Sequence, residues 1–233
     1  MGRERGRQRD RQAGRLPVLP VLLVAALLGL PTATSRPAVA DAPVHALVVG
    51  DSILEGVGAK PRRPVMARVA ARRLGWTIDV DGVGGTGYVN EGPRPGSTYG
   101  ERLARRYLTS YDVVVVEGGH NDWRADPELV AARVREVVAL VRDRAPDAEL
   151  VLIGAYDPPG VRLRGPVDGV VASVADELDV PFASPITEGW AEGLPRRFLS
   201  GDRLHPSTWG YGVLGERFAL ALDALTEAPT SGT

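Results

Sequence analysis

From Val44 onward, short β-branched apolar runs alternate with longer segments of helical periodicity, and this alternation restricts the possible folds more than any other feature. The clearest run is Val113–Val116, four valines in a row, which is typical of a buried strand. Strands that alternate with helices need right-handed crossovers, so the strands run parallel and helices cover both faces of the sheet. The sequence therefore predicts an α/β fold, a three-layer α/β/α sandwich of flavodoxin-like type with about five parallel strands.

The expected elements follow in order along the chain. Strands are predicted at 46–49, 77–80, 113–116, 150–153 and 180–182. Helices are predicted at 64–74, 99–108, 127–144, 167–178 and 207–225, with Gly- and Pro-rich loops at 82–98 and 156–166. Functional sites in such sheets lie at the carboxyl ends of the strands, so we expect chemistry directly after them.

The first forty residues differ in composition from the rest of the chain. An arginine-rich start precedes an apolar run at 16–30, and the segment closes on Ala-Val-Ala at 38–40. These are the three parts of a secretory signal peptide. The alternative is an uncleaved membrane anchor, although the run is shorter than the about 20 residues of a typical span. Either way we expect one extracytoplasmic domain at 41–225, secreted if the segment is cleaved, and a loose tail at 226–233.

Charge and cysteine content exclude several classes of function. Residues 1–40 hold seven of the 28 basic and two of the 29 acidic residues, so residues 41–233 hold 21 basic and 27 acidic residues and carry a net charge of −6. A mildly acidic domain argues against nucleic acid as a partner. The absence of cysteine excludes disulfides, thiolate metal sites and a cysteine nucleophile. We expect a monomer without a metal or an organic cofactor.

Two post-strand segments carry polar side chains that could do chemistry. Gly-Asp-Ser at 50–52 follows the first strand, where Ser52 can lie exposed at the start of a helix or can simply cap that helix. Gly-Gly-His-Asn-Asp at 118–122 follows the third strand. Asn121 can project its amide across the strand ends, or it can serve only as a turn residue. His120 fits a structural position better than a catalytic one.

A glycine-rich segment at 82–87 follows the second strand and matches G-x-G-x-x-G. A dinucleotide site needs a helix to begin at once, whereas loop sequence follows here, so we reject that interpretation. A calcium loop also fails, because Val83 and Asn90 occupy ligand positions. What remains is a loop whose backbone N–H groups can point at an anion.

The fourth segment, Asp-Arg-Leu-His-Pro at 202–206, precedes the last predicted helix. A carboxylate three residues before a histidine can meet the imidazole and fix which ring nitrogen accepts a proton. The alternative is a surface turn with a helix-starting proline. Together the four segments supply a nucleophile, a base, an orienting acid and oxyanion donors, which is the set that acyl transfer requires.

GDS near the start, then G-x-x-G, G-x-N-D and finally D-x-x-H form an ordered set that resembles the SGNH (GDSL) hydrolases and spans residues 45–222. The resemblance implies that Ser52 is the nucleophile and that His205 and Asp202 complete a catalytic triad. It also implies that the N–H of Ser52, the N–H of Gly85 and the side chain of Asn121 form the oxyanion hole.

The chain departs from the family pattern at two points. Ile53 stands where the family has leucine, and Asp81 stands where an asparagine often precedes the first glycine. The second departure leaves either Gly84 or Gly85 as the oxyanion donor, and we favour Gly85.

The resemblance implies a secreted serine esterase that hydrolyses carboxylic esters through an acyl-enzyme. The expected substrates are short acyl groups, such as acetyl, on carbohydrate or in small esters. Alternatives are a lipase or acyltransferase of the same fold, and a non-catalytic exported glycan-binding domain. Four aromatic residues beside the site loops could line a substrate site, or could simply pack in the core. They are Tyr88, Trp123, Tyr156 and Trp209.

Overall fold

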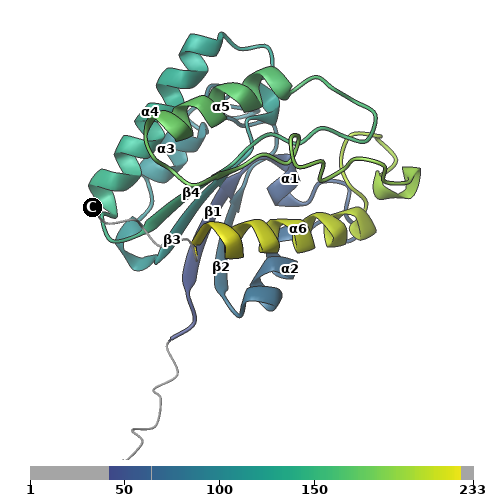
Figure 1. Cartoon of the computed structure of the whole chain (residues 1–233), viewed down its shortest axis with the longest axis horizontal. Coiled ribbons are helices and arrows are strands. Elements are labelled where there is room, and N and C mark those ends of the chain that lie inside the picture. The colour runs from purple at the N-terminus through teal and green to yellow at the C-terminus, as the bar shows by residue number, and fades with distance from the viewer. Residues whose placement is uncertain (1–41, 64, 227–233) are drawn as a thin grey trace, which may run out of the picture. The chain divides into compact units, whose positions relative to one another are not determined.

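The computed structural model describes residues 42–63 and 65–226, which belong to one compact unit, residues 41–233. Its centre is a sheet of five parallel strands in the order β2-β1-β3-β4-β5 (Figure 1). The strands are β1 (His45–Gly50), β2 (Thr77–Gly82), β3 (Val113–Glu117), β4 (Glu149–Ile153) and β5 (Phe182–Ala183). This is the flavodoxin-like strand order, so the predicted α/β fold is confirmed.

Helices cover both faces of the sheet. The helices are α1 (Ser52–Glu55), α2 (Val65–Leu74), α3 (Tyr99–Ala104), α4 (Pro127–Arg144), α5 (Gly165–Glu177) and α6 (Thr208–Thr226). Short 3-10 turns occur at Leu108–Ser110, His120–Asp122 and Arg196–Phe198. Helices α2 and α6 pack together on one face, and α3, α4 and α5 lie on the other (Figure 1).

The interior strand β1 is buried on both faces, which explains its continuous apolar sequence. Ala46 and Val48 contribute to the core beneath α2 and α6, whereas Leu47 and Val49 contribute to the core beneath α4 and α5. Helices α2 and α6 approach closely at Gly215, where an added Cβ would lie 2.5 Å from a side-chain carbon of α2. Packing on both faces therefore fixes β1, the strand that leads directly into Ser52.

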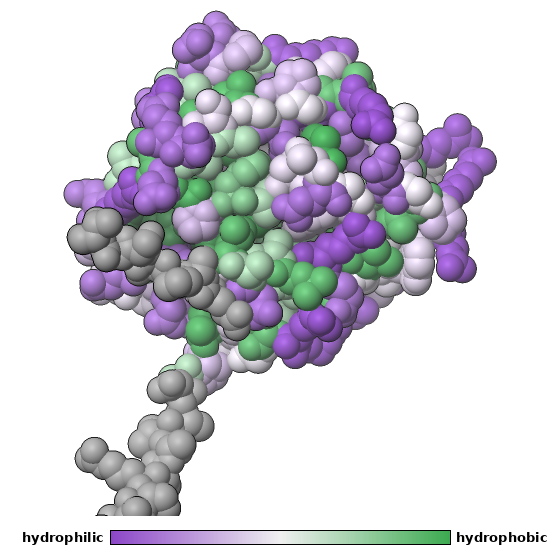
Figure 2. Space-filling model, viewed as in Figure 1, coloured by the Kyte–Doolittle hydropathy of each residue, from purple (hydrophilic) through white to green (hydrophobic). Residues whose placement is uncertain are grey.

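The surface seen in Figure 2 is mostly hydrophilic, with an apolar strip between α5 and α6. Leu220 of α6 is one of the large apolar side chains that lie half exposed. Within the described residues, no helix combines the length and the apolar character that crossing a membrane requires.

Two predicted elements differ from the observed ones. Helix α3 ends at Ala104 rather than at 108, because the N–H groups of Arg105 and Arg106 donate to carbonyls three residues back and tighten the last turn. Strand β5 begins at Phe182 rather than at 180, because Val180 N–H donates to Ala175 O and still belongs to the turn that ends α5.

The other predicted strands and helices agree with the observed bounds to within two residues. The predicted signal peptide at 1–40 lies outside the described residues. So does the predicted tail beyond Thr226, the residue that ends α6.

Candidate active site

Ser52 is the first residue of α1, directly after β1, at the carboxyl edge of the sheet. The N-cap of this helix is Asp51, whose Oδ1 accepts a hydrogen bond from Ile53 N–H at 2.8 Å. Because Asp51 caps the helix, the alternative in which Ser52 merely serves as its cap is wrong. The Ser52 hydroxyl instead faces His205.

Ser52, His205 and Asp202 form a continuous chain of hydrogen bonds. Ser52 Oγ lies 2.9 Å from His205 Nε2, and His205 Nδ1 lies 2.7 Å from Asp202 Oδ2. A carboxylate can only accept, so Nδ1 carries a proton and the Nε2 of a neutral ring is left to accept from the serine. The arrangement can therefore remove the proton from the Ser52 hydroxyl.

The Asp202 carboxylate is held by the turn in which it lies. Its Oδ1 accepts from Ser200 Oγ at 2.8 Å and from the N–H groups of Leu204 and His205 at 2.9 Å each. Burial opposes the charged form, but these hydrogen bonds and the His205 ring outweigh it and hold the pKa of Asp202 well below its usual range. Asp202 is thus an ionised group that orients the imidazole.

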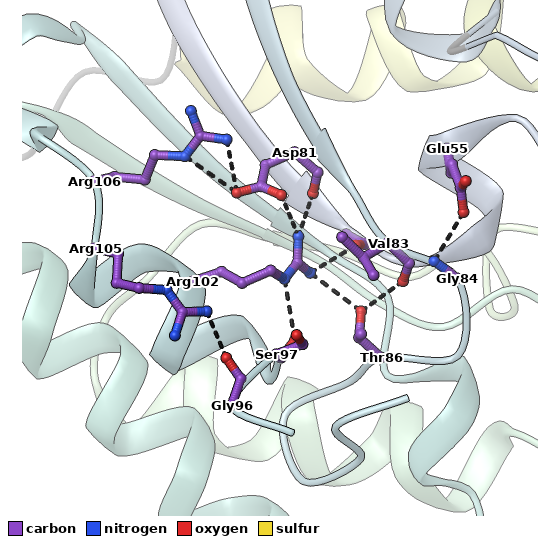
Figure 3. Close-up of polar contacts among 11 residues, drawn as sticks. Glu55, Asp81, Val83, Gly84, Thr86, Gly96, Ser97, Arg102, Arg105 and Arg106 are labelled. Carbon is purple, nitrogen blue, oxygen red and sulfur yellow. Dashed lines mark hydrogen bonds and ion pairs between the residues drawn. The ribbon is translucent and has the colours of Figure 1, made fainter. Parts of the chain in front are cut away.

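The glycine loop at 82–87 passes beside Ser52. A Cβ on Gly84 would lie 3.5 Å from the Ser52 Cβ, so the loop backbone is close to the hydroxyl. Gly84 N–H donates to Glu55 Oε2 at 2.8 Å (Figure 3), and the other oxygen of Glu55 lies 2.6 Å from the Arg62 guanidinium. Within the described residues, Gly85 N–H donates no hydrogen bond. Gly85 therefore offers this loop's free donor, whereas Gly84 does not.

A buried arginine that no sequence motif marks, Arg102, ties the glycine loop to the sheet. Arg102 of α3 donates through Nη2 to Gly50 O at 2.8 Å and to Thr86 Oγ1 at 3.2 Å. Its Nη1 donates to Asp81 O at 2.5 Å and to Asp81 Oδ1 at 2.6 Å, and its Nε donates to Ser97 O at 3.1 Å (Figure 3). The Arg102 guanidinium thus links the ends of β1 and β2 to two points in the loop, Thr86 and Ser97.

Asn121 projects from the 3-10 turn after β3 towards the same loop. Its Nδ2 donates to Thr86 O at 2.9 Å and to Asp51 Oδ2 at 3.2 Å. The amide therefore lies between the glycine loop and the N-cap of α1. The bond to Asp51 is the longer of the two. A substrate oxygen would therefore have to share the amide hydrogen that points at Asp51.

Asp122, the last residue of the Gly-Gly-His-Asn-Asp segment, fixes the end of the loop. Its carboxylate accepts from the backbone N–H groups of Tyr88, Val89 and Asn90 at 2.7 to 3.2 Å. A Cβ at position 87 would collide with Asp122 Oδ2, so Gly87 is required for this close approach.

Two further titratable groups lie buried behind Ser52. Burial raises the pKa of Asp51 to about 7, and the negative charge of Asp122 adds to this shift. Burial also raises the pKa of Glu117, at the end of β3, well above its usual range. Burial therefore favours the neutral form of both of these acids.

The second histidine near the site is structural. Burial lowers the pKa of His120 to about 4, and its Nδ1 donates to Tyr156 O at 2.9 Å. This agrees with the structural position expected for it from the sequence. Within the described residues, no group of three or more acidic or histidine side chains is arranged to hold a metal ion.

The four aromatic residues considered as a substrate wall lie in different environments. Tyr88 and Tyr156 are only 1% and 2% exposed, so their surroundings favour the core-packing alternative. Trp123 is partly buried. Trp209 is 43% exposed, and the Arg197 guanidinium lies 4.5 Å above its ring. Of the four, Trp209 has the most surface to offer a substrate.

The chain matches a known protein family and one of its members by sequence. The profile of the GDSL-like Lipase/Acylhydrolase family matches residues 48–213. GDSL lipase Rv0518 of Mycobacterium tuberculosis is 30% identical over 214 residues, which cover 85% of this chain and 91% of that protein.

Solved structures share the fold at lower identity. A family two carbohydrate esterase from Clostridium thermocellum, in complex with cellohexaose, superposes with a TM-score of 0.65 at 20% identity, over 78% of this chain and 65% of that one. The lipase Lip_vut3 from a goat rumen metagenome superposes with a TM-score of 0.57 at 18% identity, over 76% of this chain and 97% of that one.

Proposed function

Since the chain belongs to the GDSL-like lipase/acylhydrolase family and is a serine ester hydrolase, we propose that Ser52, His205 and Asp202 hydrolyse carboxylic esters through an acyl-enzyme. The observation that carries this proposal is the pair of short contacts, 2.9 Å from Ser52 Oγ to His205 Nε2 and 2.7 Å from His205 Nδ1 to Asp202 Oδ2. A nucleophile, a base and an orienting acid in hydrogen-bond contact are what acyl transfer needs.

The proposed reaction has two steps. Ser52 Oγ attacks the ester carbonyl carbon while its proton passes to His205 Nε2, and Asp202 stabilises the imidazolium. The tetrahedral intermediate collapses as His205 gives that proton to the leaving alcohol. Water, deprotonated by His205, then attacks the acyl-enzyme, and the acid leaves as Ser52 regains its proton.

The oxyanion of each tetrahedral intermediate would be met by Ser52 N–H, Gly85 N–H and the Asn121 amide. Two contacts support this assignment. Glu55 holds Gly84 N–H and leaves Gly85 N–H free within the described residues, and Asn121 lies against the carbonyl of Thr86 in the same loop. Donors placed before the reaction are effective because they need no reorganisation in the transition state.

We favour a small acyl group, such as acetyl on a carbohydrate, as the substrate. Carbohydrate esterases of family two are among the proteins that share this fold. A lipase activity is the second candidate, because the relative at 30% identity is named a GDSL lipase. Membership of a hydrolase family leaves the glycan-binding alternative without support.

The site of action proposed here is outside the cytoplasm. The basis is the sequence of residues 1–40, with an arginine-rich start, an apolar run and Ala-Val-Ala at 38–40. After cleavage the enzyme would be secreted.

A hydrolysis screen tests the proposed substrate class. The purified protein is assayed with p-nitrophenyl esters of increasing acyl length and with acetylated sugars, with and without a competing alcohol. We expect turnover of acetyl esters that falls as the acyl chain lengthens. Turnover that rises with chain length would favour a lipase, transfer to the alcohol would favour an acyltransferase, and no turnover of any ester would contradict the proposal.

A further inference from the structure

A cavity of about 560 Å³ adjoins the proposed active site, between the loop that follows α1 and the start of α6. Two of its wall residues contact the Ser52–His205–Asp202 chain. Ser200 Oγ donates to Asp202 Oδ1 at 2.8 Å, and a Cβ on Gly58 would lie 3.0 Å from the His205 Cβ. The cavity therefore begins within a side chain's length of the proposed base.

Three cationic side chains line this cavity, namely Lys60, Arg196 and Arg203. None of the three has a carboxylate oxygen within 4.0 Å in the described part of the chain, whereas most arginines around the glycine loop are paired. Residues 41–233 carry a net charge of −6, so this local excess of positive charge runs against the charge of the domain. Unpaired cations around a cavity attract an anion.

The first turn of α6 adds to the positive potential. This helix has 19 residues and begins at Thr208, whose Oγ1 accepts from Lys60 N–H at 2.8 Å. The N-terminal end of a long helix carries partial positive charge, because its first N–H groups point outwards. Trp209 follows directly, and although Arg197 lies over its ring, the side chain is 43% exposed and can contact a sugar ring.

We propose that this cavity binds a negatively charged group, a carboxylate or a phosphate, on the alcohol part of the ester substrate. The alcohol part is assigned because the leaving oxygen receives its proton from His205, and the cavity lies against His205. Lys60, Arg196 and Arg203 act through charge, and the start of α6 adds to it. This inference rests on the proposed esterase function and narrows its substrate class to acidic esters.

Matched substrates test the inference in the full chain. The acetyl esters of a methyl glucoside, of the methyl glucuronoside and of the methyl glucoside 6-phosphate are compared by kcat/KM at low and high salt. We expect both charged esters to be preferred over the neutral one, and the preference to shrink at high salt because the cations are exposed. The carboxylate and phosphate arms show which anion is preferred.

Single variants then locate the effect. Lys60→Gln and Arg196→Gln are each expected to lower the charged-to-neutral ratio of kcat/KM by roughly two- to fivefold, as for one exposed ion pair. Arg133→Gln, which removes a cation from α4 on the other face of the sheet, serves as the matched control and should leave the ratio unchanged.

The outcomes separate this inference from the proposed function. Turnover of the neutral acetyl ester with no preference for the charged esters overturns the anion site but leaves the esterase intact. A preference that both cavity variants retain also overturns it. No turnover of any of the three esters would count against the esterase itself.

Discussion

The Glu55 carboxylate accepts a hydrogen bond from Gly84 N–H at 2.8 Å, and the next donor along the loop, Gly85 N–H, is left without an acceptor in the described residues. Glu55 reaches the loop from α1, the helix that begins with Ser52. The same short helix thus carries the proposed nucleophile and the side chain that orients the proposed oxyanion loop. Glu55 is a positioning residue and does not touch the reacting atoms.

Replacing Glu55 with alanine should lower kcat with little change in KM, because the loop loses the bond that fixes its N–H groups. A hydrogen bond to a charged group contributes about 1.5–3 kcal/mol, so the loss should be roughly 10- to 100-fold. Glu55→Gln keeps an acceptor oxygen and should recover most of the activity. Steady-state kinetics of both variants, with Glu136→Ala of α4 as the surface control, provide the test. An unchanged kcat in the alanine variant would show that the loop does not need Glu55.

Asn121→Ala removes one proposed oxyanion donor and leaves Ser52, His205 and Asp202 intact. Loss of one such donor typically costs about 10²–10³ in rate. We expect the loss in kcat, because the negative charge develops only in the transition state. An unchanged kcat with a raised KM would instead make Asn121 a substrate-binding residue. Circular dichroism of the variant checks that the loss does not come from unfolding.

The buried carboxyl group of Asp51 should make stability depend on pH. Burial raises its pKa from 3.8 to about 7, so the folded state binds this proton more tightly than the unfolded state does. The free energy of unfolding should therefore fall as pH rises from about 4 to about 7 and should level off above that.

Asp51→Asn cannot ionise and keeps an N-cap side chain, so it should flatten this part of the profile. Burial raises the pKa of Glu117 as well, so the variant should keep a residual fall in stability with pH. Melting temperatures across this pH range, with the exposed Asp176→Asn as control, test the prediction. Equal slopes in Asp51→Asn and the unmodified protein would contradict it.

Much of the fold was predictable because valine-rich runs and amphipathic periodicity repeat along the chain. Helix α4 was predicted with its observed bounds, since Val130, Val134 and Val138 recur at helical spacing and form its buried face. Strand β5 was predicted to begin two residues before its observed start, because the hydrogen bond from Val180 N–H to Ala175 O belongs to a turn. Periodicity does not encode such a contact.

The residues that hold the loop were harder to predict than the residues that follow the strands. Ser52 and Glu55 are spaced like a capping box, yet the N-cap is Asp51 and Glu55 turns outwards to Gly84. Arg102 gives no signal in the sequence, because its acceptors at Gly50, Asp81 and Thr86 come together only when the sheet forms.

Export should be visible at the N-terminus of the mature protein. We expect cleavage after Ala40, since the Ala-Val-Ala pattern at 38–40 follows the apolar run. N-terminal sequencing of protein from the culture medium tests this prediction. Recovery of the uncleaved chain in the membrane fraction would show that the segment is an anchor.

The most direct test of the proposed mechanism is covalent labelling of the protein with a fluorophosphonate, followed by mass spectrometry of its peptides. One adduct on Ser52 is expected, and Ser52→Ala should lose both the adduct and the hydrolysis of esters. His205→Ala should react far more slowly, because Ser52 Oγ would lose the base that lies 2.9 Å away. Labelling at another residue, or ester hydrolysis that survives in Ser52→Ala, would contradict Ser52 as the nucleophile.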